Sequence, residues 1–362
     1  MEISILGATS SVGFNLIKLF QNRYPEVKLK LAGRNITKLE YLNKKFANVI
    51  SVHKFSHGSD LNEILKDTEA CIDLSYQISG VPSQLVRSSV KHADNLIYQS
   101  RTNEIKNLII VGSVGIYGEP KINYKWQDAP LPNEVKPNSL YGQVKLSVER
   151  EAWKKAGNIS TNLFLVRSGH IFGASTKMAG AFIQKLINNG PVLLEGRSVF
   201  SNATTLNGLC NSIINLCFNN TLKGRYCANH VDLSDIPYGT LVNKLADILD
   251  VEPSKLPVVD KKRSKSGLFS YLKKYQEDFF LLQSKIGLYD FGLSEFALNQ
   301  IQPKFNSFKI YEQLAVNNNP ILESIYNSDK IIHSKNICGD QLDLDHEFEQ
   351  IKDWISFAGF KV

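Results

Sequence analysis

Residues 2–18 read Glu-Ile-Ser-Ile-Leu-Gly-Ala-Thr-Ser-Ser-Val-Gly-Phe-Asn-Leu-Ile-Lys. A short apolar run that ends at Gly7 predicts a strand, and apolar residues at helical spacing from Ser11 onward predict a helix. Gly7 and Gly13 let the backbone turn sharply and let the helix pack close to the strand. The free N–H groups at the helix start suit an anion. The stretch therefore predicts a strand, a tight phosphate-binding turn and a helix.

The turn departs from the full dinucleotide-binding signature in its middle, where Ser10 stands in the place of a third glycine. Serine is small enough that a pyrophosphate can still approach. We expect the phosphates to lie against Gly7, Thr9, Ser10, Ser11, Val12 and Gly13. A plain strand-to-helix connection is the alternative interpretation.

Strands alternate with helices along the first half of the chain. Further strands are expected over 27–32, 48–53, 70–75 and 107–112, with a helix capped at Ser59 or Asp60 and a long helix over 81–103. This alternation predicts the α/β class, with a Rossmann-type, doubly wound parallel sheet. In such a sheet, ligands bind at the carboxyl ends of the strands.

The second expected strand ends in Gly33-Arg34-Asn35. In a dinucleotide-binding sheet this end lies beside the adenine ribose, where an acidic residue would bind the 2′-hydroxyl of NAD. Arg34 and Lys38 instead suit a 2′-phosphate, although an exposed arginine on a loop explains the residue as well. The sequence therefore predicts NADP(H) as the preferred cofactor and NAD(H) as the alternative, with Ser75 as a further contact.

Three residues form a candidate catalytic set: Ser113 at the end of the fifth strand, and Tyr141 and Lys145 on the helix that follows. Residues four apart share one helix face, so the ammonium lies near the phenol and favours its phenolate form. Such a tyrosine can act as a general acid or base, while Ser113 donates to the same substrate oxygen. The Tyr-x-x-x-Lys spacing is common on solvated helices. The order of the three motifs along the chain favours the catalytic interpretation.

With these motifs, residues 1–250 resemble the extended short-chain dehydrogenase/reductases, the NAD-dependent epimerase/dehydratase family, whose members mostly act on nucleotide-linked sugars. The resemblance rests on the glycine turn, on Ser113 placed four residues before Tyr117-Gly118, on Tyr141 and Lys145, and on residues 166–173. It implies that Tyr141 is the acid/base, that Lys145 binds the nicotinamide ribose and tunes Tyr141, and that Ser113 polarises the substrate.

The resemblance also narrows the reaction. Family dehydratases carry an acid pair in the two positions after the catalytic serine or threonine, where this chain has Val114 and Gly115. Among the reactions of the family, hydride transfer at one carbon is therefore the one that these residues suit. We expect an NADP(H)-dependent reductase of a keto group on a nucleotide-activated sugar. A sugar-nucleotide 4-epimerase is the alternative, and a non-catalytic NADP(H)-binding sensor is a further one. Ser89 replaces the family's usual asparagine and is left out of the catalytic set.

The expected domain division places the cofactor-binding Rossmann domain at 1–175, its sheet completed by parts of 200–250. Residues 176–362 form the substrate-binding region and a C-terminal extension. Helices are expected over 179–189 and 233–250 and near 351–354, a strand over 224–228 and a polar loop over 201–205. The basic amphipathic segment 261–282 is interpreted as a cleft cover or a homodimer contact in preference to a membrane contact.

Composition argues against several kinds of partner. The net charge of +7 is mild for a chain of 362 residues, so it gives little reason to expect nucleic acid binding. No run approaches the ~18 apolar residues of a membrane span, and no signal peptide precedes the first strand. The 5 cysteines are scattered, which predicts reduced thiols and no metal site. We therefore expect a cytoplasmic enzyme with a small-molecule substrate.

Overall fold

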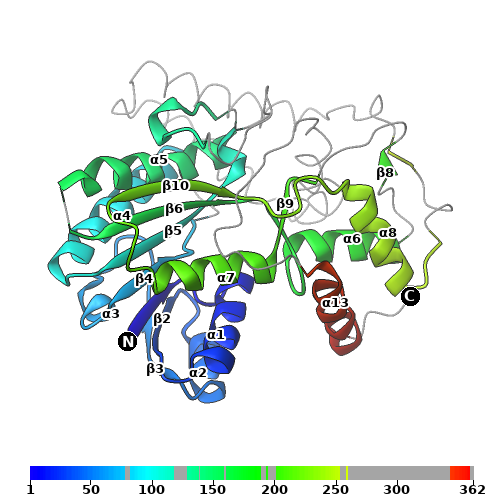
Figure 1. Ribbon diagram of the computed structural model, residues 1–362, viewed down its shortest axis with the longest axis horizontal. Helices are drawn as coiled ribbons and strands as arrows, with labels where there is room; N and C mark the ends of the chain where they lie inside the picture. Colours follow the sequence, from blue (N-terminus) through cyan, green and yellow to red (C-terminus); the bar gives the residue numbers. More distant parts are fainter. Residues whose placement is uncertain are drawn as a thin grey trace, which may run out of the picture.

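The computed structural model describes residues 1–77, 82–117, 129–137, 139–158, 160–188, 193–194, 201–252, 258–259 and 343–358. A central sheet of 7 strands, all paired in parallel, has the order β10-β6-β5-β4-β1-β2-β3 (Figure 1). Its strands are β1 (Glu2–Leu6), β2 (Lys28–Gly33), β3 (Val49–Lys54), β4 (Ala70–Asp73), β5 (Asn107–Ser113), β6 (Asn162–Ser168) and β10 (Arg225–His230). The predicted Rossmann-type α/β class is confirmed.

The order of the strands reverses between β1 and β4. From β1 the chain winds outward through β2 and β3, then crosses back to β4 and continues through β5 and β6 to β10. In open parallel sheets, ligands bind beyond the carboxyl ends of the strands at such a reversal. The turn after β1 lies at this point.

Helices cover both faces of the sheet. One face carries α1 (Ser11–Arg23), α2 (Ile36–Lys45) and α7 (Leu206–Cys217), and the other carries α3 (Asn62–Leu65), α4 (Pro82–Thr102) and α5 (Leu140–Lys155). Along β5, Ile109 belongs to the first core, whereas Leu108 and Ile110 belong to the second. Successive side chains of a strand point to opposite faces, so a strand buried on both sides is apolar throughout.

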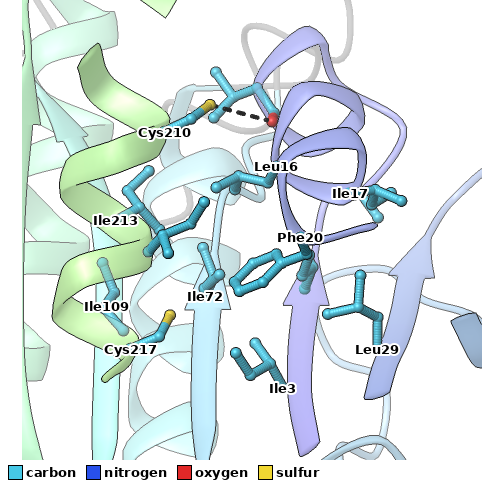
Figure 2. Packing of buried hydrophobic residues seen from close by; sticks show 14 of the residues in the cluster. Ile3, Leu16, Ile17, Phe20, Leu29, Ile72, Ile109, Cys210, Ile213 and Cys217 are labelled. Carbon is cyan, nitrogen blue, oxygen red and sulfur yellow. Dashed lines mark hydrogen bonds between the residues drawn. The ribbon is translucent and has the colours of Figure 1, made fainter. Parts of the chain in front are cut away.

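The first core is built by α1 and α7 over the sheet. Figure 2 shows Phe20 of α1 and Ile213 of α7 packed above Ile72 of β4. Cys210 of α7 lies 3.7 Å through its Sγ from the carbonyl oxygen of Val12. Burial raises the pKa of the Cys210 thiol to about 12, so the thiol stays protonated. This core holds α1, and with it the turn, in place.

A second group of helices gathers beyond one end of the sheet: α6 (Lys177–Ile187), α8 (Tyr238–Ile248) and α13 (Leu344–Ala358) (Figure 1). They share one apolar cluster, to which Phe182, Leu241 and Ile351 contribute fully buried side chains. Two short strands, β7 (His170–Phe172) and β9 (Ala203–Thr205), pair beside it, and β8 (Leu193–Leu194) pairs with β11 (Val258–Val259). The final helix is where the sequence predicts it. The domain division at residue 175 stays a prediction.

Several element boundaries differ from the sequence prediction, three of them as follows. Helix α8 begins at Tyr238 and not at Leu233, because the residue before Pro237 is disfavoured in helical conformation. Part of the expected loop over 201–205 is the strand β9, which pairs with β7. Helix α3 begins at Asn62 after Leu61, while Asp60 accepts a hydrogen bond from the N–H of Asn62.

Several predicted features lie outside the described residues, among them the basic amphipathic segment 261–282. Within the described part of the chain, no helix is long and apolar enough to cross a bilayer. The same residues contain no group of three or more His, Cys, Asp or Glu side chains arranged to hold a metal ion.

Candidate functional site

Two of the predicted catalytic residues meet at Gly115. A Cβ atom on Gly115 would lie 3.0 Å from Cε1 of Tyr141 and 3.3 Å from Oγ of Ser113. Ser113 ends β5, and Tyr141 stands in the first turn of α5, which Ser139 caps by accepting a hydrogen bond of 3.1 Å from the N–H of Gly142. The early start of α5 therefore brings the Tyr141 ring to the carboxyl end of β5.

The two side chains that meet at Gly115 each carry a hydroxyl group. The Tyr141 side chain is 42% exposed. The Ser113 hydroxyl accepts a hydrogen bond of 3.1 Å from the N–H of Gly115, which leaves its own hydrogen free to be donated. Ser113 can therefore donate to a ligand oxygen near Gly115, beside the Tyr141 ring.

Lys145 stands one helical turn after Tyr141 and points toward the same strand. Its Nζ donates a hydrogen bond of 3.2 Å to the carbonyl oxygen of Val111 on β5. The same Nζ lies 4.8 Å from the centre of the Tyr76 ring. The structure thus gathers Ser113, Tyr141 and Lys145 at one end of β5, together with an aromatic side chain that the sequence analysis did not single out.

The turn after β1 has the close packing expected of a phosphate-binding turn. Gly7 has a φ of 78°, and a Cβ atom there would lie 3.0 Å from the carbonyl carbon of Leu74. A Cβ atom on Gly13 would lie 2.5 Å from the carbonyl oxygen of Ala8. Both positions therefore require glycine. Ser10 caps α1, because its hydroxyl accepts a hydrogen bond of 3.1 Å from the N–H of Gly13.

Ser11 and Val12, the next residues of the turn, make different contacts. The Ser11 hydroxyl donates a hydrogen bond of 2.7 Å to the carbonyl oxygen of Ser175, which ties the turn to the loop after β7. The Val12 side chain is buried in the core of α1 and α7. The N–H groups in the first turn of a helix have no acceptor within that helix. Ser11 and Val12 can therefore offer their backbone to an anion.

The loop after β2 and the first turn of α2 each carry a basic residue. Lys38 donates through Nζ a hydrogen bond of 3.2 Å to the carbonyl oxygen of Thr9, and Arg34 lies exposed on the loop. A Cβ atom on Gly33 would lie 3.6 Å from the Thr9 side chain, so the two segments are in contact. Asn35 caps α2 by accepting a hydrogen bond from the N–H of Lys38. The mouth of the turn is therefore basic.

Ser75 lies in a polar network that the sequence analysis missed. Its Oγ is 3.2 Å from Nε2 of His57 and 3.2 Å from Nε2 of His92. The two imidazole rings stack at 4.2 Å, and Nε2 of His92 lies 2.9 Å from Oδ2 of Asp73. A Cβ atom on Gly7 would lie 3.1 Å from the backbone nitrogen of Ser75. The predicted cofactor contact Ser75 therefore adjoins the turn, but its hydroxyl serves two histidines.

This network holds one negative charge at the end of β4. Burial by itself raises the pKa of Asp73, but the charge and hydrogen bond of His92 and the hydrogen bonds of Ser75 outweigh burial and lower the pKa to about 2. Burial lowers the pKa of His57 to about 4, and the nearby charges of His92, Lys145 and Arg34 contribute in the same direction. His57 is therefore neutral at physiological pH.

The chain also matches a known protein family. The sequence profile of the NAD-dependent epimerase/dehydratase family matches residues 3–201. The chain belongs to this family. A relative of this family member is the UDP-glucose 4-epimerase of Vibrio cholerae, which is 23% identical over 269 residues, covering 71% of this chain and 78% of the relative.

Solved structures share the fold of this epimerase/dehydratase family member. A dTDP-glucose 4,6-dehydratase from Bacillus anthracis in complex with NAD has a TM-score of 0.58 at 14% identity, covering 72% of this chain and 84% of that chain. A UDP-N-acetylglucosamine 4-epimerase from Bacillus cereus has a TM-score of 0.56 at 14% identity, covering 77% and 96%. MoeE5 in complex with UDP-glucuronic acid and NAD has a TM-score of 0.55 at 17% identity, covering 70% and 84%.

Family membership confirms part of the sequence analysis. The predicted resemblance and the expectation of an NAD(P)-dependent enzyme of the extended short-chain dehydrogenase/reductase type are confirmed. The preference for NADP(H) and the roles of the site residues stay predictions. Sequence reasoning missed Tyr76 and the histidine network. Tyr76 had one signal, because it lies just beyond the carboxyl end of a central strand, where ligands bind in this fold.

Proposed function

We propose that this family member reduces a keto group on a nucleotide-activated sugar with NADP(H), using Tyr141 as the acid/base. The observation that carries the proposal is that the Tyr141 ring and the Ser113 hydroxyl both lie close to the Cβ side of Gly115. A protein that only senses the cofactor has no use for this arrangement. The non-catalytic alternative is therefore less well supported.

The residues of this site suit the reduction of a carbonyl group. A bound nicotinamide would supply the hydride. Tyr141 gives its phenolic proton to the carbonyl oxygen as negative charge develops there, and Ser113 donates a hydrogen bond to the same oxygen. Lys145 brings a positive charge to this end of β5, where negative charge develops during the transfer. Re-protonation of Tyr141 from water then restores the site.

The turn after β1 and the end of β2 support NADP(H) as the cofactor. The N–H groups of Gly7 and Ala8 bind the carbonyl oxygen of Ala32, whereas those of Ser11 and Val12 at the start of α1 are available to a pyrophosphate. Residues 33–38 contribute Arg34 and Lys38 and no acidic side chain. A 2′-phosphate would find two cations there, whereas the 2′-hydroxyl of NAD would find no carboxylate.

A second candidate is a sugar-nucleotide 4-epimerase. The similarity to the Vibrio cholerae UDP-glucose 4-epimerase favours it, and two solved neighbours, MoeE5 and the Bacillus anthracis dehydratase, are complexes with NAD. An epimerase uses the same acid/base, because it removes a hydride from a carbon and returns it to that carbon. The two candidates differ in the fate of the cofactor.

Cofactor stoichiometry tests the proposal. The purified protein is mixed with a UDP-linked 4-keto-hexose and deuterium-labelled NADPH, and separately with UDP-glucose and NAD. We expect one NADPH to be consumed for each product formed, with deuterium in the sugar. Interconversion of UDP-glucose and UDP-galactose without net change in nicotinamide absorbance would replace the reductase with the epimerase. If the protein binds the cofactor but catalyses neither reaction, both candidate functions are rejected.

A further inference from the structure

Tyr76 lies three residues beyond the end of β4 and outside the proposed catalytic set. Its half-buried ring packs against the apolar side chains of Leu85, Val86 and Val144. This cluster joins α4 to α5 beneath the site. The ring is therefore held from one side, and its remaining surface faces the two residues on which the proposed chemistry depends.

The ring contacts both of those residues. Nζ of Lys145 lies 4.8 Å from the ring centre, within the range of a cation–π interaction. The Tyr141 ring meets it edge to face, with ring centres 5.2 Å apart and an interplanar angle of 76°. Lys145 is thus held between the Tyr76 ring and the Val111 carbonyl oxygen, and Tyr141 is held between Tyr76 and Gly115.

The phenol of Tyr76 does not compete as a base. Burial raises its pKa above the ordinary tyrosine value, and the neighbouring Tyr141 adds to this effect. The hydroxyl therefore stays protonated throughout the neutral range. The contacts to Lys145 and Tyr141 are made by the face and the edge of the ring, which phenylalanine also has.

We propose that Tyr76 is a positioning residue, whose ring fixes the Lys145 ammonium on the Val111 carbonyl and the Tyr141 ring beside Ser113. The inference rests on the proposed function, because it assumes that Tyr141 and Lys145 perform the chemistry. It predicts that the aromatic ring at position 76 is required and that the hydroxyl is not. Tyr76→Phe is therefore the matched control for Tyr76→Leu and Tyr76→Met.

The first test follows the amine of Lys145 directly and needs no substrate. The full-length protein is treated briefly with an acetylating ester, and the modification of each lysine is quantified by peptide mass spectrometry. We expect Tyr76→Leu and Tyr76→Met to raise the acetylation rate of Lys145 about three-fold, because the amine loses its aromatic cover. Tyr76→Phe should match the wild type, and the exposed Lys223 should react equally in all variants.

The second test measures turnover with the UDP-linked 4-keto-hexose and NADPH, or with UDP-glucose if the epimerase is correct. We expect Tyr76→Leu to lower kcat roughly ten-fold with little change in KM. Tyr76→Phe should keep the wild-type kcat. Because the proposed reduction needs the protonated form of Tyr141, the basic limb of the kcat pH profile should move to higher pH in Tyr76→Leu and Tyr76→Met. A loss of packing alone would not move that limb.

Three results would overturn the inference. The first is an unchanged rate of Lys145 acetylation in both Tyr76→Leu and Tyr76→Met. The second is an equal loss of turnover in Tyr76→Phe, which would transfer the role to the hydroxyl. The third is tighter binding of NADPH to Tyr76→Leu with undiminished turnover, which would make the ring an obstacle. An active Tyr141→Phe variant would instead reject the proposed function, while the acetylation result would still stand.

Discussion

Arg167 and Glu149 form an ion pair of 2.8 Å that is closed to water, since their side chains are 0% and 1% exposed. Arg167 belongs to β6, and Glu149 lies one helical turn after Lys145 on α5. The guanidinium also donates through Nη1 to the Tyr117 hydroxyl at 2.8 Å. The pair therefore fixes the helix that carries Tyr141 and Lys145 against the sheet.

Removing one partner should destabilise the fold strongly. Glu149→Ala leaves a buried guanidinium without its counter-charge, and we expect the free energy of unfolding to fall by about 3 to 5 kcal/mol. Asp94→Ala is the control, because it breaks an exposed pair with Lys155, which is on α5 like Glu149, and should destabilise the fold far less. Urea unfolding measures both. Equal losses would show that burial of the Arg167–Glu149 pair does not matter.

Glu347 should make stability depend on pH. Its buried carboxylate on α13 accepts hydrogen bonds from the N–H of Leu206 and the amide of Asn207, yet burial raises its pKa to about 7 from an ordinary value of 4.5. Because the folded pKa is the higher one, the stabilising contribution is complete below pH 4.5 and is lost as the pH rises through about 7.

The matched comparison is between two glutamates of α13. Relative to Glu347→Gln, the wild type should lose on the order of 3 kcal/mol of unfolding free energy between pH 4.5 and pH 8. The exposed Glu349, changed to Gln, should leave the wild-type slope unaltered. A wild-type curve parallel to that of Glu347→Gln would mean that Glu347 titrates normally.

Gly115 should tolerate no side chain. In Gly115→Ala the new Cβ would lie 3.0 Å from the Tyr141 ring and 3.3 Å from the Ser113 hydroxyl, so one of them must move. We expect kcat to fall at least ten-fold, since small displacements at a reacting centre are costly. In Gly180→Ala the Cβ meets Trp354 at 3.7 Å, an ordinary contact, and activity should be kept. Equal kcat values for Gly115→Ala and Gly180→Ala in steady-state kinetics would contradict the placement of the site.

The parts of the fold that follow from local pattern were predictable from the sequence. Strands such as β5 are apolar runs, and the turn after β1 is marked by two glycines that the structure shows to be required. The gathering of Ser113, Tyr141 and Lys145 at one end of β5 was likewise predictable. A parallel sheet brings the carboxyl ends of its strands to one edge, and helical spacing puts Tyr141 and Lys145 on one face.

The rest depends on contacts between segments far apart in the chain. Tyr76 meets Lys145 only because β4 and β5 are neighbours in the sheet, and His57 stacks on His92 across a separation of 35 positions in the chain. Nothing in the local pattern of either residue marks such a contact. The later start of α8 was readable in principle, since Pro237 marks it.

Arg34 should select the cofactor. Loss of a charge-assisted pair to a 2′-phosphate costs roughly 1.5 to 3 kcal/mol, so Arg34→Ala should weaken NADPH binding about ten-fold or more and leave NADH binding nearly unchanged. Lys28→Ala is the control, because Lys28 is an exposed cation at the opposite end of β2. Fluorescence titration with NADPH and with NADH measures the two affinities in the wild type and in both variants. Equal affinity of the wild type for NADPH and NADH would remove this argument for a reductase.

The central claim is that Tyr141 exchanges the proton in a nicotinamide-dependent hydride transfer. The most direct measurement is kcat of Tyr141→Phe, taken alongside the affinity for NADPH. General acid/base catalysis typically contributes a factor of about 100 or more, so kcat should fall at least that far while NADPH binding stays within a few-fold of wild type. A Tyr141→Phe enzyme that binds NADPH normally and turns over within a few-fold of wild type would contradict the claim.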